Sequence, residues 1–138
     1  DNMIYGPNDL TPIAVLDWEL STIGHPLSDF AYCAMMYFTP AGARPSPGLA
    51  GLNLADEGIP SLSEFVAMYA EAAGRTSVDE INYYMAFSKF RMSAILQGVY
   101  KRSLDGNASS RIAGQMGEFA KTFAKAGMMF ADGTLRVS

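Results

Sequence analysis

The sequence has 138 residues, of which 49% are hydrophobic and 17% charged, and its formal net charge is −4. This length suits one domain with a sizeable core, and the low charged fraction suits a surface that packs against another lobe. Nucleic acids and anionic membranes need a concentrated basic face, so the net charge argues against both as main partners. The single cysteine, Cys33, excludes an internal disulfide framework and fits the cytoplasm, where we expect the protein to work.

The first elements form a predicted β-hairpin followed by a helix. Residues 3–5 and 13–16 favour strands, and residues 6–9 supply Gly, Pro, Asn and Asp for a turn. We expect a helix over residues 28–38, with Ser28 as its N-cap. Cys33 lies among apolar residues of this helix, so we expect it to be a small core side chain.

The rest of the chain predicts a long loop and three helices. Residues 39–60 are rich in Pro and Gly, which indicates a loop. Residues 61–64 and 77–80 both have the pattern of a capping box, and they start helices that end near residue 74 and before residue 105. The last helix is expected over residues 109–131. The sequence therefore predicts an α+β fold that is mostly α-helical.

The ends of the predicted hairpin carry the first candidate site. Antiparallel strands bring their outer ends together, so Asn2 and Asp17 can converge. Amide and carboxylate oxygens are ligands for Mg²⁺, which leaves its other positions to water and phosphates. Glu19 lies two residues beyond Asp17 and can reach the same side. The alternative is that Asp17 is a solvated acid or caps a neighbouring loop.

The motif around this corner resembles the aminoglycoside phosphotransferase and choline kinase superfamily. Asn2 matches the Asn of the family's catalytic loop, and Asp17 in Leu-Asp-Trp-Glu matches its metal-binding, catalytic aspartate. The segment Gly-His-Pro-Leu-Ser-Asp continues the motif, and the resemblance gives Asp29 the role of a structural acid bracing the catalytic loop. The implied fold is the C-terminal lobe of a protein-kinase-like phosphotransferase, with residues 1–19 as metal-site hairpin and 61–138 as substrate-side helices.

Two segments are most similar to one branch of this superfamily. Residues 16–24 and 90–102 resemble the phosphotransferase-like domain of the acyl-CoA dehydrogenase family 10 and 11 proteins. The resemblance implies ATP and Mg²⁺ as cofactors. It also implies a small hydroxyl-bearing acceptor, and a hydroxyacyl-CoA is one acceptor of this kind. The family's general-base Asp and its nucleotide-binding lobe would lie upstream of residue 1. We therefore expect the 138 residues alone to be an inactive C-lobe fragment.

Several charged residues have competing interpretations. His25 is the single histidine, and we expect a hydrogen-bonded structural role for it rather than that of a general base. Lys89, Arg91, Lys101 and Arg102 form either a site for an anionic substrate or a solvated helix face. Two functions compete with the kinase: a non-catalytic binding module with the same fold, and a metal-dependent hydrolase using Asp17 and Glu19. The hydrolase would need further ligands.

Overall fold

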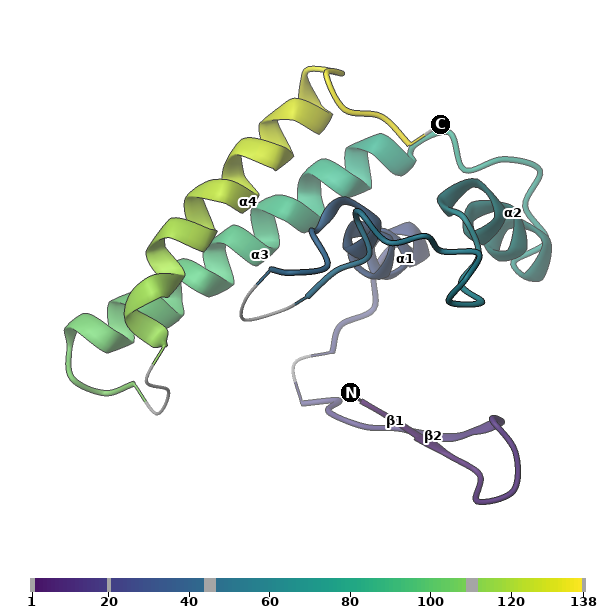
Figure 1. Ribbon diagram of the computed structural model, residues 1–138, viewed down its shortest axis with the longest axis horizontal. Helices are drawn as coiled ribbons and strands as arrows, with labels where there is room; N and C mark the ends of the chain where they lie inside the picture. The colour runs from purple at the N-terminus through teal and green to yellow at the C-terminus, as the bar shows by residue number, and fades with distance from the viewer. Residues whose placement is uncertain (1, 20, 44–46, 109–111, 138) are drawn as a thin grey trace.

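The computed structural model describes residues 2–19, 21–43, 47–108 and 112–137. A two-stranded antiparallel sheet precedes a helical body, as Figure 1 shows. The mostly α-helical α+β fold predicted from the sequence is confirmed. The elements in chain order are β1 (Met3–Tyr5), β2 (Pro12–Val15), α1 (Pro26–Ala34), the 3₁₀ helix η1 (Met35–Phe38), α2 (Leu62–Ala72), α3 (Ile81–Leu104), the 3₁₀ helix η2 (Ala113–Gln115) and α4 (Met116–Ala131).

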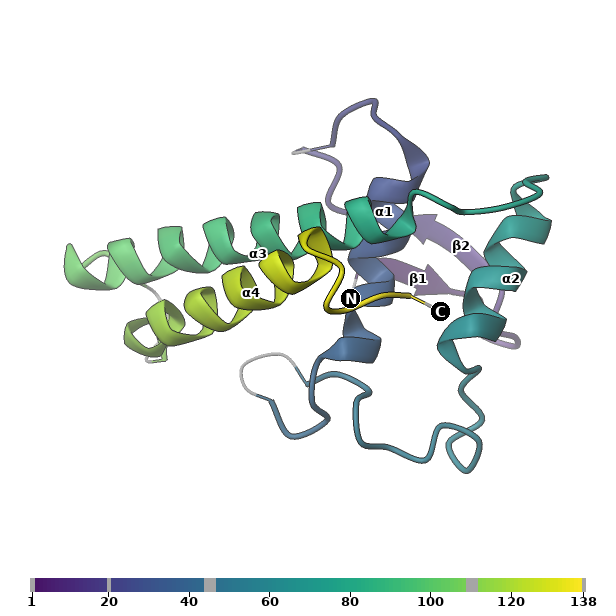
Figure 2. The ribbon, with the colours of Figure 1, turned by 90° about the horizontal axis from the view of Figure 1, so that it is seen from above.

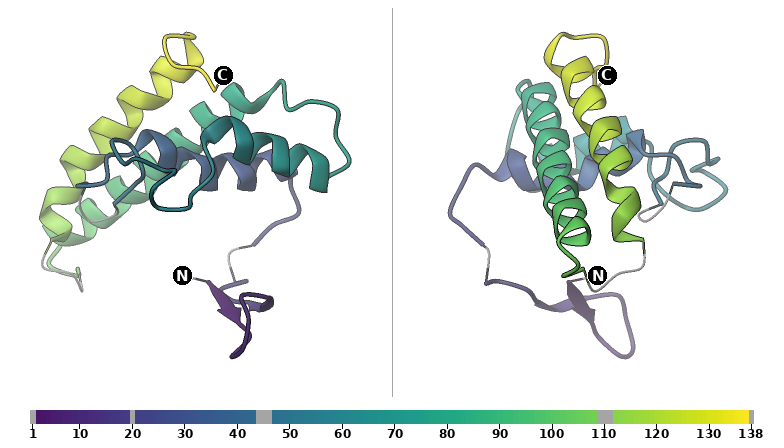
Figure 3. Two further views of the ribbon diagram at one scale, coloured as in Figure 1. Left: turned by 45° about the vertical axis from the view of Figure 1, so that its right-hand side comes forward. Right: turned by 90° about the vertical axis from the view of Figure 1, so that its left-hand side faces the viewer.

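The hairpin of β1 and β2 lies apart from the helices, below them in Figures 1 and 3. Met3 pairs with Val15 and Ile4 with Ala14, and the register shifts before Tyr5. The strand side chains are exposed, apart from the half-buried Ala14. A two-stranded ribbon with no buried face contributes little to the core, so its residues are available to contact other groups.

The start of α1 differs from the prediction. His25 has an extended backbone and is the N-cap, because its Nδ1 accepts a hydrogen bond from the Leu27 backbone N–H at 3.3 Å. Pro26 occupies the first helical position, where its missing N–H is not needed. The expected N-cap, Ser28, therefore lies inside the first turn. The helix also ends earlier than expected, at Ala34, where the chain tightens into η1.

Cys33 is exposed, so the prediction that it is a core side chain was wrong. The buried face of α1 follows helical spacing and consists of Leu27, Phe30, Ala31 and Ala34. Cys33 lies outside this face around the helix and is turned away from the core. The apolar residues on either side of it in the sequence do not determine its burial.

One of the two predicted capping boxes forms. Ser61 accepts a hydrogen bond from the Glu64 backbone at 3.3 Å, and the Glu64 carboxylate accepts one from the Ser61 backbone at 2.8 Å, at the start of α2. The prediction of a second capping box, over residues 77–80, was wrong, because α3 starts after Glu80 without a side-chain cap. There the Ser77 hydroxyl donates to the Asp79 carboxylate instead.

The segment of residues 39–60 was predicted to be a loop. In its described part an isolated bridge joins Pro40 to Ala50, and no helix or strand forms, as predicted.

The long helices α3 and α4 lie side by side, as Figure 2 shows from above. The main core gathers residues of α1, η1, the first half of α3 and the end of α4, and a smaller one joins Leu96 to Met116 and Ala120. A Cβ on Gly127 would lie 3.3 Å from the Ala86 carbonyl oxygen, so glycine permits this close approach. The expected start of the last helix, residues 109–111, lies outside the described residues, and α4 begins at Met116.

The helices in the described part of the chain include none that combines the length and the apolar character needed to cross a membrane.

Candidate functional site

The open end of the hairpin brings two predicted site residues together. The Leu16 backbone N–H donates to the Asn2 carbonyl at 2.8 Å, which extends the ladder one residue past the strands. The Asn2 side-chain amide then donates to Oδ2 of Asp17 at 3.2 Å. Both residues are exposed. The acceptor atoms that this hydrogen bond does not use are Oδ1 of Asp17 and the amide oxygen of Asn2.

Asp17 has a backbone conformation that is uncommon for its residue type. Its φ is 65°, and the other residues with positive φ in the described part of the chain are all glycines. The left-handed region costs most side chains free energy, although Asp and Asn tolerate it better than other residues with a Cβ. Such conformations concentrate at functional sites, where the surrounding structure holds them in place. The turn at Asp17 directs the chain away from β2 and keeps the carboxylate at the corner.

The oxygen atoms of this corner suit a hard divalent cation that keeps water and phosphate ligands. Asn2 and Asp17 together offer an amide oxygen and a carboxylate oxygen, which is the donor set expected for Mg²⁺ beside a phosphate. Glu19 is exposed, and no hydrogen bond in the described residues joins it to either of them. The described residues contain no cluster of three or more His, Cys, Asp or Glu side chains that could hold a metal ion. The corner is therefore suited to a metal that a phosphate helps to bind.

A cavity of about 750 Å³ has Trp18, the residue after Asp17, in its lining, although Asn2 and Asp17 themselves do not line it. Trp18 leads into it, and its indole N–H donates to the Val15 carbonyl at 2.6 Å, which fixes the ring against the end of β2. The opposite wall belongs to α3. The lining combines aromatic, charged and hydroxyl side chains: Trp18, Ser21, Thr22, His25, Ser28, Asp29, Tyr83, Tyr84, Phe87, Arg91 and Ile95, with Gly24.

Asp29 and Arg91 supply the two charges of the cavity. Asp29 is exposed in the first turn of α1, where a carboxylate favours the helix dipole. Its bracing of a catalytic loop stays a prediction. The Arg91 guanidinium lies 4.8 Å from the centre of the Tyr32 ring, so it is held on the cavity wall by a cation–π contact. The exposed side chains of Lys101 and Arg102 belong to the far end of α3.

The sequence allowed two interpretations of the basic residues, a site for an anionic substrate or a solvated helix face, and Lys89 fits neither. It is 2% exposed, its Nζ donates to the Met35 carbonyl at 3.2 Å, and it lies 4.9 Å from the centre of the Phe123 ring. Burial lowers the pKa of its ammonium group to about 8. Lys89 is therefore neither part of a solvated face nor accessible to an anionic substrate. Its position on the helical stripe of α3, four residues after Met85, is the signal that could have indicated this burial.

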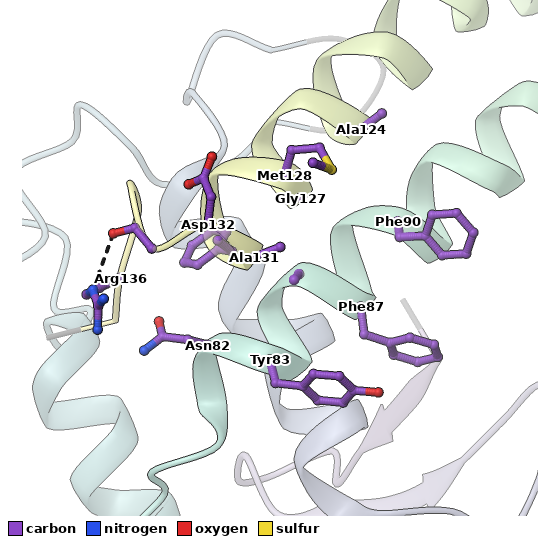
Figure 4. Close-up of a pocket in the computed structure, with 13 residues that line it drawn as sticks. Asn82, Tyr83, Phe87, Phe90, Ala124, Gly127, Met128, Ala131, Asp132 and Arg136 are labelled. Carbon is purple, nitrogen blue, oxygen red and sulfur yellow. Dashed lines mark hydrogen bonds between the residues drawn. The ribbon is translucent and has the colours of Figure 1, made fainter.

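Sequence reasoning also missed an apolar cavity of about 680 Å³ between α3 and α4. In Figure 4 the rings of Tyr83, Phe87 and Phe90 project from α3 on the same side, with Met128 on α4. Small residues, Ala86, Ala124, Gly127 and Ala131, also line this cavity, and Asn82, Asp132 and Arg136 add polar groups to the lining. Tyr83 and Phe87 also line the cavity beside the corner, so the two cavities share a wall.

Comparison with known proteins shows similarity over nearly the whole chain. It is 44% identical over 131 residues to acyl-CoA dehydrogenase family member 10 of Mus musculus, which is 95% of this chain and 12% of the mouse protein. It is 40% identical over 136 residues to family member 11 of Homo sapiens, with 97% of this chain and 17% of the human protein covered. A probable acyl-CoA dehydrogenase of Arabidopsis thaliana, IBR3, is 38% identical over 114 residues, covering 80% of this chain and 14% of that protein.

The chain thus spans less than a fifth of the length of each of these relatives. No solved structure matches it. The model of the phosphotransferase enzyme family matches residues 1–65, which contain the hairpin, the corner of Asn2 and Asp17, and α1. The resemblance inferred from the sequence motifs is therefore confirmed: residues 1–65 match the phosphotransferase enzyme family, and nearly the whole chain is similar to acyl-CoA dehydrogenase family members 10 and 11.

Proposed function

We propose that this chain is part of an ATP-dependent phosphotransferase that transfers the γ-phosphate to the hydroxyl group of a small molecule. The observation that carries the proposal is the pairing of Asn2 with Asp17 at 3.2 Å, in the part of the chain that matches the family. In this family, phosphoryl transfer relies on positioning and on neutralising the charge of the phosphates. The corner offers oxygen ligands for that purpose, next to a cavity that can hold an acceptor.

Asp17 and Asn2 have separate roles in this proposal. The Asp17 carboxylate and the Asn2 amide oxygen hold Mg²⁺, which when bound with ATP neutralises charge on the phosphates. The hydrogen bond from Asn2 orients the Asp17 carboxylate, and the left-handed backbone keeps it at the corner. Glu19 is proposed as a weaker contributor through a second metal ion or water, and Asp29 as a structural acid.

The base that accepts the proton from the acceptor hydroxyl is proposed to be the family's catalytic-loop aspartate, which precedes Asn2 in the motif. The 138 residues also offer no equivalent of the family's nucleotide-binding lysine at the described corner. We therefore propose that these residues alone bind parts of the substrates but do not transfer phosphate. The single cysteine supports the cytoplasm as the place of action.

The proposed acceptor is a hydroxyacyl-CoA or a related hydroxyacyl derivative. The names of the relatives refer to acyl-CoA, although this chain covers only 12% and 17% of the mouse and human proteins. The cavity beside the corner supports an acceptor of mixed character. Its aromatic walls, Trp18, Tyr83 and Phe87, suit a carbon chain, and its polar side chains suit oxygen atoms.

The experiment that tests this proposal compares Asp17→Asn with wild type in the protein at the full length in which the cell makes it. Asn has nearly the same size and tolerates positive φ, so the fold should persist while the carboxylate ligand is lost. We expect Mg²⁺-dependent ATP binding, measured by calorimetry, to weaken at least tenfold. Phosphoryl transfer to 3-hydroxybutyryl-CoA should fall at least about a hundredfold, because charge stabilisation of the transition state is lost.

Asp9→Asn is the matched control, because it makes the same change of charge in the turn of the same hairpin. Asp9 accepts a hydrogen bond from the Thr11 backbone at 3.0 Å, and an Asn oxygen can accept the same bond. This variant should bind ATP and transfer phosphate like wild type. Equal turnover of Asp17→Asn and wild type would show that Asp17 has no role in phosphoryl transfer. A folded protein that binds no Mg-ATP would favour the non-catalytic module, and metal-dependent release of phosphate to water alone would favour the hydrolase.

A further inference from the structure

His25 is held in one tautomer by the helix that it caps. Its Nδ1 accepts a hydrogen bond from the Leu27 backbone N–H at 3.3 Å. A nitrogen that accepts cannot carry a proton, so the neutral ring carries its proton on Nε2. In the described residues no side chain or backbone group accepts a hydrogen bond from Nε2. The donor of this imidazole is therefore available to a ligand.

The orientation of the ring is fixed as well. The imidazole stacks on the Tyr84 ring with a centroid distance of 4.8 Å and an interplanar angle of 6°. Tyr84 belongs to α3, which packs against α1, so the stack connects the ring to the helical body. Two contacts on different elements thus restrain the imidazole, one at Nδ1 and one on its face. A restrained donor loses little conformational freedom when it binds a ligand.

His25 lines the cavity beside the metal corner, together with Trp18 and Asp29. With Nδ1 occupied by the cap, Nε2 is the nitrogen that the ring can offer to this cavity. Capping alone does not account for histidine at this position, because Ser, Thr, Asp and Asn are the preferred N-cap residues. Their side chains end near the first turn, and they do not provide a donor as distant from the backbone as Nε2.

We propose that His25 is a positioning residue for the acceptor, whose carbonyl oxygen accepts a hydrogen bond from Nε2–H in this cavity. This inference rests on the proposed function and adds the part of the acceptor that the cavity recognises. The Asp29 carboxylate is an acceptor, Arg91 is held over the Tyr32 ring, and the Trp18 indole N–H donates to the Val15 carbonyl, so Nε2–H of His25 is the ring donor left for a ligand here. Tyr83 and Phe87, which line the same cavity, then contact the carbon atoms of the acyl group.

Two variants remove the Nε2–H donor, leave only shorter side chains whose own donors lie nearer to the backbone, and keep the cap. His25→Asn and His25→Ser place favoured N-cap residues before Pro26, so α1 should keep its start and the thermal midpoint should change little. Two probes complete the design: 3-hydroxybutyryl-CoA and its thioether analogue S-(3-hydroxybutyl)-CoA, which lacks only the carbonyl oxygen. Binding of each probe to the full-length protein is measured by calorimetry, with no phosphoryl transfer needed for this readout.

Wild type should bind the thioester about five- to tenfold more tightly than the thioether, as one hydrogen bond to a ligand predicts. Both variants should bind the two probes equally, and their Kd for the thioester should rise by the same factor. Equal Kd values for the thioester in wild type and in the folded variants would overturn the inference, as would absence of thioester binding to wild type. Failure of phosphoryl transfer by a wild-type protein that discriminates between the probes would count against the proposed function alone.

Discussion

Lys89 carries its ammonium group into the contact between α3, α4 and η1. Its Nζ reaches the Met35 carbonyl and faces the Phe123 ring, and the ion pairs in the described residues do not include it. The Thr39 hydroxyl donates to the same Met35 carbonyl at 3.1 Å. A buried ammonium group without an acid partner costs free energy, which the lowered pKa reflects.

The stability of the protein should therefore rise with pH above about 8. The pKa of Lys89 is about 8 in the folded protein and near 10.5 without burial. Between these values the unfolded chain holds more protons, so the free energy of unfolding increases with pH. We expect a rise of about 2 kcal/mol between about pH 7.5 and about pH 9.5. Urea unfolding at both pH values measures it.

Lys89→Met is the control for this pH dependence, because Met fills similar space without a charge. The Met35 carbonyl keeps its hydrogen bond from Thr39, so the substitution leaves no unpaired acceptor there. The variant should be more stable than wild type at about pH 7 by about 1 kcal/mol or more. Its stability should be nearly constant over the same pH window. A variant with the same rise as wild type would show that another group causes it.

At the scale of single elements, the two Ser-containing segments before α2 and α3 make a matched pair. Both have the sequence of a capping box, yet only Ser61 caps a helix. Ser61→Ala should lower the free energy of unfolding by about 1 kcal/mol. Ser77→Ala should change it by less than about 0.5 kcal/mol, because the hydroxyl of Ser77 donates its hydrogen bond to the exposed Asp79 and does not cap the helix. Urea unfolding of the two variants tests this difference, and equal effects would contradict it.

The same elements show what the sequence could predict. Local patterns predict the hairpin, the loop and α2, because a turn or a capping box acts over a few residues. The exposure of Cys33, the burial of Lys89 and the missing cap of α3 depend on which face each helix turns toward its neighbours. The pairing of Asn2 with Asp17 follows from hairpin geometry, whereas the cavities beside and beyond it form only when α3 packs against α1 and α4. Tertiary packing therefore determines the part of the site that local patterns do not.

At the scale of the whole molecule, two parts of unequal stability are joined. The helical body holds the buried core, whereas the strands of the hairpin are almost entirely exposed and lie apart from it (Figure 3). A two-stranded ribbon without a packed face is marginally stable in water. In the 138-residue chain, the amide of Leu16 should therefore exchange with solvent at least about a hundredfold faster than that of Met85 in α3. Hydrogen exchange followed by NMR measures both, and equal protection would show that the hairpin unfolds only with the body.

The exposed hairpin also makes ligand affinity depend on a conformational equilibrium. Asn2 and Asp17 face each other only while the strands are paired, so the fraction of molecules with a formed hairpin multiplies the intrinsic affinity of the corner. A surface that covers the hairpin and raises this fraction would strengthen ligand binding without touching the ligand. By reciprocity, a ligand bound at the corner would strengthen attachment of that covering surface by the same factor.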